Sequence, residues 1–163
     1  MNNFENGVAF LNKLKMIFYM MLGIPLIFFV ILFLKYREGV VLGDYAVLYD
    51  AFKVVVPFFC ILTSGVAYLL YFQLLKKARK ETTLRLKLQQ LFNANIVKFA
   101  LLEGATVFVL LAYFLTGHPL FAAFYVFMLI LFGMSNPSIY SLMTDLKLPK
   151  KEADIMRENR IIE

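Results

Sequence analysis

The residue in this chain with the clearest capacity for chemistry is Glu103, a carboxylic acid inside the apolar run from Ile96 to Thr116. Lys98 is the one other charged residue of that run. An ionised group at the centre of a bilayer costs at least ~2.5 kcal/mol, so such residues face protein or water, find a partner, or stay protonated. A carboxyl group in this setting can bind a proton or coordinate a cation. Glu103 is therefore the first candidate for a functional residue.

Two further polar side chains lie at a similar depth if the apolar runs of the chain are antiparallel helices. Counted from the basic flanks, Glu103 and Tyr68 are each the eighth residue of their run, and Asn136 is the ninth. A helical rise of ~1.5 Å per residue places this layer ~12 Å inside the membrane. The sequence therefore predicts an ion or proton site formed by Glu103, Tyr68 and Asn136, with Ser64 and Thr106 as contributors.

Two prolines, Pro25 and Pro137, lie at the level of this polar layer. Each lacks a backbone donor and leaves a carbonyl of its own helix free to accept a hydrogen bond or coordinate a cation, so we predict helix hinges there. Two alternatives remain open for the polar layer. One is an interhelical clamp in which protonated Glu103 donates a hydrogen bond, worth ~0.6 kcal/mol on average in membranes. The other is contact with a partner chain.

The elements that must position these residues are predicted by the composition. Hydrophobic residues make up 61% of the chain, Trp is absent, and the mean hydropathy is +0.74, which is typical of an integral membrane protein. Four apolar runs are each near the ~20 residues that cross hydrocarbon as a helix. We expect a single domain, residues 1–163, that is an all-α bundle of four transmembrane helices. The predicted spans are 16–34, 54–75, 96–116 and 119–144.

Basic residues predict the orientation of these spans. Three lie on one side, Lys35, Arg37 and Lys53, and 14 lie on the other. These 14 are Lys13, Lys15, Lys76, Lys77, Arg79, Lys80, Arg85, Lys87, Lys98, Lys147, Lys150, Lys151, Arg157 and Arg160. By the positive-inside rule, both termini are expected in the cytoplasm, and the localisation predicted is the bacterial inner membrane. The net charge of +6 is then explained by contact with anionic lipid headgroups, without nucleic acid.

Several polar segments lie outside the runs. Leu84, Leu88, Leu91 and Phe92 recur with helical spacing, so we expect a cytoplasmic amphipathic helix that lies on the membrane surface or extends the third span, with a partner-binding face as the alternative. A short charged helix is predicted after Pro149, as a solvated tail, with docking as the alternative. Between the first two spans, we expect the aromatic rings of Tyr36, Tyr45 and Tyr49 at the membrane interface. Lys98, near the cytoplasmic end of its run, is expected to extend its ammonium group to the headgroups.

The sequence gives little support for catalysis. Cys60 and His118 are the only residues of their types, so neither an intramolecular disulfide nor a metal site is expected. No nucleophile elbow, His pair or phosphate-binding glycine loop is present. We therefore predict a protein that is not an enzyme and has no cofactor.

Two resemblances bear on function. Residues 76–116, with a basic loop followed by Ala100-Leu101-Leu102-Glu103-Gly104, resemble the loop and second helix of the proteolipid ring subunit of rotary ATP synthases. That resemblance implies ion binding by Glu103. The Arg-Gln-Pro turn and the repeated glycine pattern of that family are absent. The order of Leu-Leu-Glu-Gly, Leu115-Thr116-Gly117 and Asp145-Leu146-Lys147-Leu148 is similar to small uncharacterised four-span bacterial membrane proteins, which implies no activity.

The function expected from these observations is that of a structural or accessory subunit of a membrane complex. Its partners would be the lipid bilayer and other membrane protein chains or copies of itself. The alternative is a proton- or cation-coupled carrier that uses Glu103. Four spans leave little room for an enclosed pathway in a monomer, so either function favours an oligomer.

Overall fold

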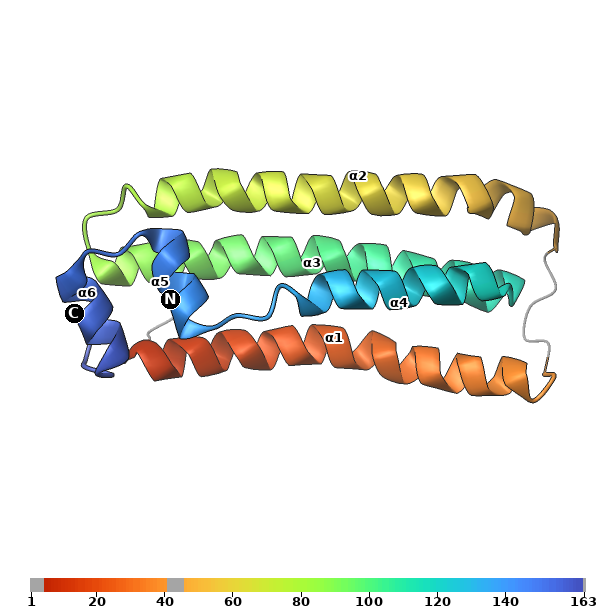
Figure 1. Cartoon of the computed structure of the whole chain (residues 1–163), viewed down its shortest axis with the longest axis horizontal. Coiled ribbons are helices and arrows are strands. Elements are labelled where there is room, and N and C mark those ends of the chain that lie inside the picture. The colour runs from red at the N-terminus through yellow and green to blue at the C-terminus, as the bar shows by residue number, and fades with distance from the viewer. Residues whose placement is uncertain (1–4, 41–45, 163) are drawn as a thin grey trace. The chain divides into compact units, whose positions relative to one another are not determined.

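The structure is a computed structural model that describes residues 5–40 and 46–162, and helices make up most of this part of the chain. Figure 1 shows the helices in their order along the chain. Their bounds are Gly7–Arg37 (α1), Ala46–Ala78 (α2), Leu84–Thr116 (α3), Pro119–Gly133 (α4), Ile139–Leu146 (α5) and Lys150–Arg157 (α6). The all-α prediction is thus confirmed for the described residues.

Three of these helices are long and apolar enough to cross a membrane. They are α1, the part Leu48–Ala78 of α2, and α3, with 31 to 33 residues each. At ~1.5 Å per residue they are ~46 to 50 Å long, which exceeds the ~30 Å of the hydrocarbon core. Each therefore has length to spare beyond a span, and the chain has the helices of a membrane protein.

The exposed side chains of α1 and α2 agree with the first two predicted spans. On α1, exposed large apolar side chains follow one another from Met16 to Leu34, and on α2 they run from Val54 to Phe72. A soluble helix would bury such residues on one face, whereas a membrane helix exposes them to lipid. The ranges 16–34 and 54–75 are therefore the parts of these helices suited to contact with hydrocarbon.

The fourth predicted span differs from the structure, because residues 119–144 are not one helix. Helix α4 ends at Gly133 after 15 residues, and α5 begins only at Ile139. Pro137 has no backbone N–H and disfavours helical conformation at Asn136, so the helix stops before this pair. Helix α5 then starts anew with a capping box, in which the Ser138 hydroxyl accepts from the Ser141 amide at 3.1 Å.

The amphipathic pattern between the second and third predicted spans is confirmed, and the segment is the first part of α3. The four residues of the predicted amphipathic pattern, Leu84, Leu88, Leu91 and Phe92, are buried, whereas Leu86 is exposed. The segment therefore extends the third predicted span as a continuous helix rather than forming a separate one.

The described residues belong to two compact units, and each long helix contributes to both. The first unit contains the described parts of Met1–Tyr19, Tyr68–Lys98 and Asn136–Glu163, and the second contains those of Met20–Ala67 and Phe99–Ser135. All 14 basic residues assigned above to the cytoplasmic side belong to the first unit. Lys35, Arg37 and Lys53 belong to the second.

In the first unit, the C-terminal segment packs against the beginning of α1 and against α3, as Figure 1 illustrates. Met156 of α6 is fully buried, and its side chain would lie 3.1 Å from a Cβ added at Gly7. The Lys87 ammonium group of α3 lies 2.8 Å from both carboxylate oxygens of Glu152. The prediction of a short helix after Pro149 is confirmed, but the prediction that it is a solvated tail is wrong. The apolar side chain of Met156 gives this charged helix one buried face.

In the second unit, aromatic side chains surround the turn between α3 and α4. The Tyr36 hydroxyl donates to the Phe114 carbonyl at 2.5 Å, and the Tyr49 ring lies 4.2 Å from the His118 ring. Gly117 adopts a left-handed conformation, φ 63°, directly against the Tyr36 ring. Two of the three tyrosines predicted at the interface therefore pack on this turn, and Tyr45 lies outside the described residues.

Candidate functional site

The five predicted site residues are divided between the two compact units. Tyr68 and Asn136 belong to the first unit, and Glu103, Ser64 and Thr106 belong to the second.

In the first unit, Tyr68 and Asn136 contact different residues. The Tyr68 ring centroid is 6.0 Å from the Lys98 ammonium nitrogen. The exposed Asn136 amide donates to the Tyr19 hydroxyl at 3.4 Å, a long hydrogen bond. Pro137 is buried in the connection between α4 and α5, whereas Pro25 lies within α1, which continues to Arg37.

In the second unit, Ser64 and Thr106 have different roles. The Thr106 hydroxyl is buried and donates to the Leu102 carbonyl of its own helix at 2.5 Å. The Ser64 hydroxyl is buried and has no hydrogen-bond partner within the described part of the chain. It lines an apolar groove of about 420 Å³ between α2 and α4, together with Cys60 and Met128. No hydrogen bond joins either residue to Glu103 within the described ranges.

Glu103 itself is half-buried on α3. Over residues 5–40 and 46–162, the structure has no hydrogen bond or ion pair that involves its carboxyl group. Its neighbour Gly104 is exposed, and a Cβ placed on Gly104 would meet no atom within 4 Å. The carboxyl group of Glu103 thus lies beside an open, small-residue position on an otherwise apolar helix.

Gly104 is part of a line of exposed residues that we call the α3 stripe. The stripe consists of Ala100, Gly104, Val107, Leu111 and Phe114, which are separated by four, three, four and three residues. At 3.6 residues per turn, this spacing keeps all five on one side of the helix. Glu103 precedes Gly104 and so lies at the edge of the stripe.

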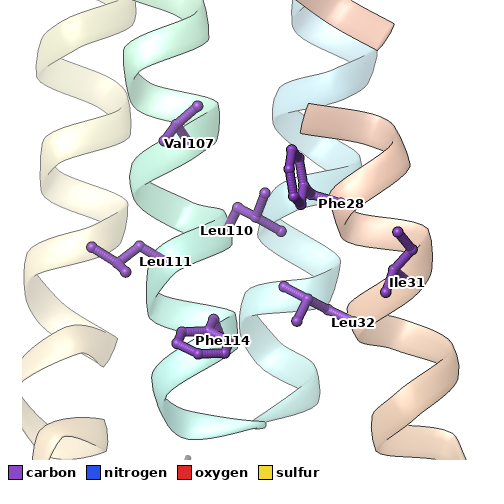
Figure 2. Close-up of a pocket in the computed structure, with 7 residues that line it drawn as sticks. All are labelled: Phe28, Ile31, Leu32, Val107, Leu110, Leu111 and Phe114. Atoms are coloured by element: carbon purple, nitrogen blue, oxygen red, sulfur yellow. The ribbon is translucent and has the colours of Figure 1, made fainter. Parts of the chain in front are cut away.

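A groove between α1 and α3 borders the α3 stripe, as Figure 2 shows. Its volume is about 310 Å³. The lining side chains are all apolar and come from both helices: Phe28, Ile31 and Leu32 of α1, and Val107, Leu110, Leu111 and Phe114 of α3. Glu103 is four residues before Val107 and seven before Leu110, so it lies on the same side of α3 as this wall. The second unit therefore presents an apolar groove with a carboxyl group next to one wall.

Sequence reasoning missed a polar cluster in the first unit. Lys98 is buried with 7% exposure, and its ammonium nitrogen is 4.2 Å from the Tyr71 ring centroid. The Tyr71 hydroxyl donates to the Asp145 carboxylate at 2.5 Å, and the Arg79 guanidinium donates to the Asp145 carbonyl at 2.7 Å. A cation on an aromatic face is attracted by the ring quadrupole. The prediction that Lys98 extends to the headgroups is thus wrong.

One signal in the sequence points to this cluster. Asp145 is the first acidic residue after the fourth apolar run and stands within a strongly basic flank. The partner of a lone carboxylate depends on tertiary packing, however, and helical spacing alone does not relate Asp145 to Tyr71 across 74 residues. The cluster holds α5 against α2 through the Tyr71–Asp145 hydrogen bond, and Lys98 of α3 lies over the Tyr71 ring.

These groups can form hydrogen bonds and ion pairs and can bind protons. Over the described ranges, no group of three or more His, Cys, Asp or Glu side chains is placed to hold a metal ion. Comparison of the chain with family models, with curated proteins and with solved structures gives no match.

Proposed function

We propose that this protein is a structural or accessory subunit of a membrane complex and that it contacts its partners through helix α3. The proposal is carried by one observation on Glu103, a residue of a helix that could cross a membrane. Its carboxyl group has no hydrogen bond or ion pair within the described chain. It lies beside the exposed, small-residue part of the α3 stripe. A partner chain at this face would supply the hydrogen bond or ion pair that Glu103 lacks within the described chain.

The physical basis is the cost of a polar group in hydrocarbon. An intramembrane carboxyl group without a partner is costly whether ionised or protonated, because lipid tails offer no hydrogen bonds. Association in membranes relies on close packing and hydrogen bonds between helices, and small residues allow close approach. Ala100 and Gly104 are exposed small residues four positions apart, next to Glu103. Both requirements for helix association therefore meet on one face of α3.

The topology that we propose has four crossings and both termini in the cytoplasm of a bacterial cell, in the inner membrane. The distribution of basic residues supports it, with 14 on the proposed inner side and three on the outer side. Helix α4 is shorter than the hydrocarbon core, so the fourth crossing would be completed by the connection 134–138 and α5 near the inner interface.

A proton- or cation-coupled carrier that uses Glu103 is the second candidate. The half-exposed position of this carboxyl group on a helix that could cross the membrane favours it, since such a group can exchange a proton. In this case Glu103→Gln would abolish pH-dependent transport in liposomes while the protein remained folded. Normal transport by that variant would exclude the carrier.

Native mass spectrometry after mild extraction from the natural membrane tests the subunit proposal. We expect the chain to be found in an assembly of fixed stoichiometry, with foreign membrane chains or further copies of itself. A monodisperse monomer would contradict the proposal. Orientation is tested in a Cys60→Ser background with Lys151→Cys and Glu38→Cys, whose side chains are exposed. An impermeant maleimide should label the first in inverted vesicles and the second in right-side-out vesicles.

A further inference from the structure

We propose that the groove between α2 and α4 binds a lipid-soluble quinone, whose carbonyl oxygen accepts a hydrogen bond from the Ser64 hydroxyl and whose apolar chain lies along α4. The groove belongs entirely to the second compact unit. Its wall consists of four side chains from each helix, between residues 57 and 64 of α2 and between residues 124 and 131 of α4. The inference goes beyond the proposed function, because it involves neither Glu103 nor the α3 stripe. It assigns a binding site, and the ligand undergoes no chemical change there.

The groove has a buried floor and an exposed rim. Cys60 and Met128 form the floor and are buried, whereas Ile61 and Phe127 on the rim are exposed at 74% and 56%. This part of α2 lies within the range suited to contact with hydrocarbon, so the groove opens to lipid. Its volume of about 420 Å³ is that of a small-molecule site, and such sites are mostly apolar with a few polar groups that fix the ligand's orientation. A molecule dissolved in the bilayer can therefore enter it.

Ser64 supplies the polar group of this groove. Its hydroxyl oxygen is buried and has no hydrogen-bond partner among the described residues. Hydroxyl groups within helices commonly donate to the carbonyl four residues earlier, as Thr106 and Thr116 of α3 do at 2.5 and 2.8 Å. Ser64 does not form this bond, and a buried hydroxyl without a partner is costly. The wall of the groove thus contains a donor that a ligand with an acceptor atom would satisfy.

The depth of Ser64 determines which lipid can satisfy it. Ser64 is the eleventh of the 22 residues in the range 54–75, so in the crossing that we propose for α2 it lies near the centre of the bilayer. Phospholipid headgroups stay at the interface, and their hydrocarbon chains accept no hydrogen bond. An ionised fatty acid would place a charge in hydrocarbon. A quinone is neutral, dissolves in hydrocarbon and carries carbonyl acceptors, and its ring suits the aromatic side chains of Phe124 and Phe127.

A second groove on α4 gives room for the chain of the ligand. It has a volume of about 270 Å³, contains Leu120 and Ala123, and shares Phe124 and Phe127 with the first groove. From Leu120 to Leu131, the two grooves extend over ~16 Å of the helix. An elongated molecule fits this path better than a compact one. By contrast, the groove between α1 and α3 is lined by apolar side chains only, so it offers a ligand no hydroxyl group (Figure 2).

Equilibrium binding in lipid nanodiscs tests this site. The full-length protein is titrated with tritiated decylubiquinone, and protein-free nanodiscs give the amount that dissolves in the lipid alone. We expect saturable binding above that amount. Ser64→Ala should raise the dissociation constant about fivefold, the equivalent of one average hydrogen bond. Tyr125→Phe is the matched control, with an expected effect below twofold. The Tyr125 hydroxyl is also buried without a partner in the described chain, but it is not part of the groove wall.

The carbonyl group and the chain of the ligand are tested separately. Decylbenzene, which has the same chain and no carbonyl, should displace the tritiated probe at least fivefold less effectively than unlabelled decylubiquinone does. Ala123→Phe fills the second groove and should weaken the binding of decylubiquinone at least tenfold. Ala51→Phe on α2 lies outside both grooves and should leave binding unchanged. Both alanines are exposed, so the fold accommodates the larger side chain.

Three results would overturn the inference. The first is binding no greater than that of protein-free nanodiscs. The second is equal displacement by decylbenzene, which would mean that the groove accepts any apolar chain. The third is an equal effect of Ser64→Ala and Tyr125→Phe, which would mean that the Ser64 hydroxyl does not contact the ligand. None of these results bears on the subunit proposal, which native mass spectrometry tests independently.

Discussion

Removal of a single hydroxyl group, in Tyr71→Phe, tests the side-chain hydrogen bond between Tyr71 of α2 and Asp145 of α5. The Tyr71 hydroxyl donates to the Asp145 carboxylate at 2.5 Å in a partly buried position. Hydrogen bonds to charged groups contribute about 1.5–3 kcal/mol. Because the pair is only partly buried, we expect the lower end, about 1.5 kcal/mol, which corresponds to about a tenfold change in an equilibrium constant. Phe retains the ring over which Lys98 lies.

Amide hydrogen exchange in lipid nanodiscs measures this effect. The Leu142 amide donates to the Ser138 carbonyl at 3.0 Å within α5, so its exchange reports on the opening of this helix. We expect about tenfold faster exchange in Tyr71→Phe, and no further change when Asp145→Asn is added. Tyr140→Phe, which removes a hydroxyl from a side chain with 74% exposure, is the control. Unchanged exchange in Tyr71→Phe, or an equal change in Tyr140→Phe, would refute the reasoning.

Three further predictions concern packing. Met156→Ala empties a fully buried site, so it should cost about 2–5 kcal/mol and make the C-terminal segment sensitive to limited proteolysis, whereas Met134→Ala, at 80% exposure, should not. Gly117→Ala imposes a Cβ 2.8 Å from the Tyr36 ring at a φ of 63° and should lower the melting temperature in detergent, unlike Gly133→Ala, whose Cβ has open space. Lys87→Met should loosen the C-terminal segment by leaving Glu152 unpaired, and Glu152→Gln should restore part of the loss; proteolysis rates that do not change in this order would contradict the ion-pair assignment.

The parts of the fold that were predicted from the sequence depend on local pattern alone. The runs of large apolar residues on α1 and α2 identify the ranges suited to contact with lipid, because every residue of a membrane helix is either exposed to lipid or packed in protein. The alternation of Leu84, Leu88 and Leu91 with charged residues likewise predicts which side of α3 is buried. Each of these features is contained within a few turns of one helix.

The features that were missed depend on contacts between distant residues or on competition between signals. Hydrophobicity favours one helix over residues 119–144, but Pro137 and the preceding Asn136 outweigh it, and α4 ends at Gly133. The C-terminal segment has a charged composition typical of a solvated tail. It is held instead by Met156 and by the ion pair between Glu152 and Lys87, 65 residues away. Such contacts have no signature in composition.

The two charged residues of the third predicted span show how tertiary structure distributes polar groups. Lys98 has the longer side chain and lies near the helix end, which favours escape to the headgroups, yet the Tyr71 ring and the buried cluster around Asp145 hold it inside the first unit. Glu103 has no comparable contact in the second unit, although its depth makes it the more costly group to leave alone. A carboxyl group left on an open face of a membrane helix stays protonated, faces water, or is satisfied by a group outside the chain, and we propose the last of these for Glu103. The burial of Lys98 therefore strengthens the case for association through α3, because it removes the nearest cation along that helix as a competing partner.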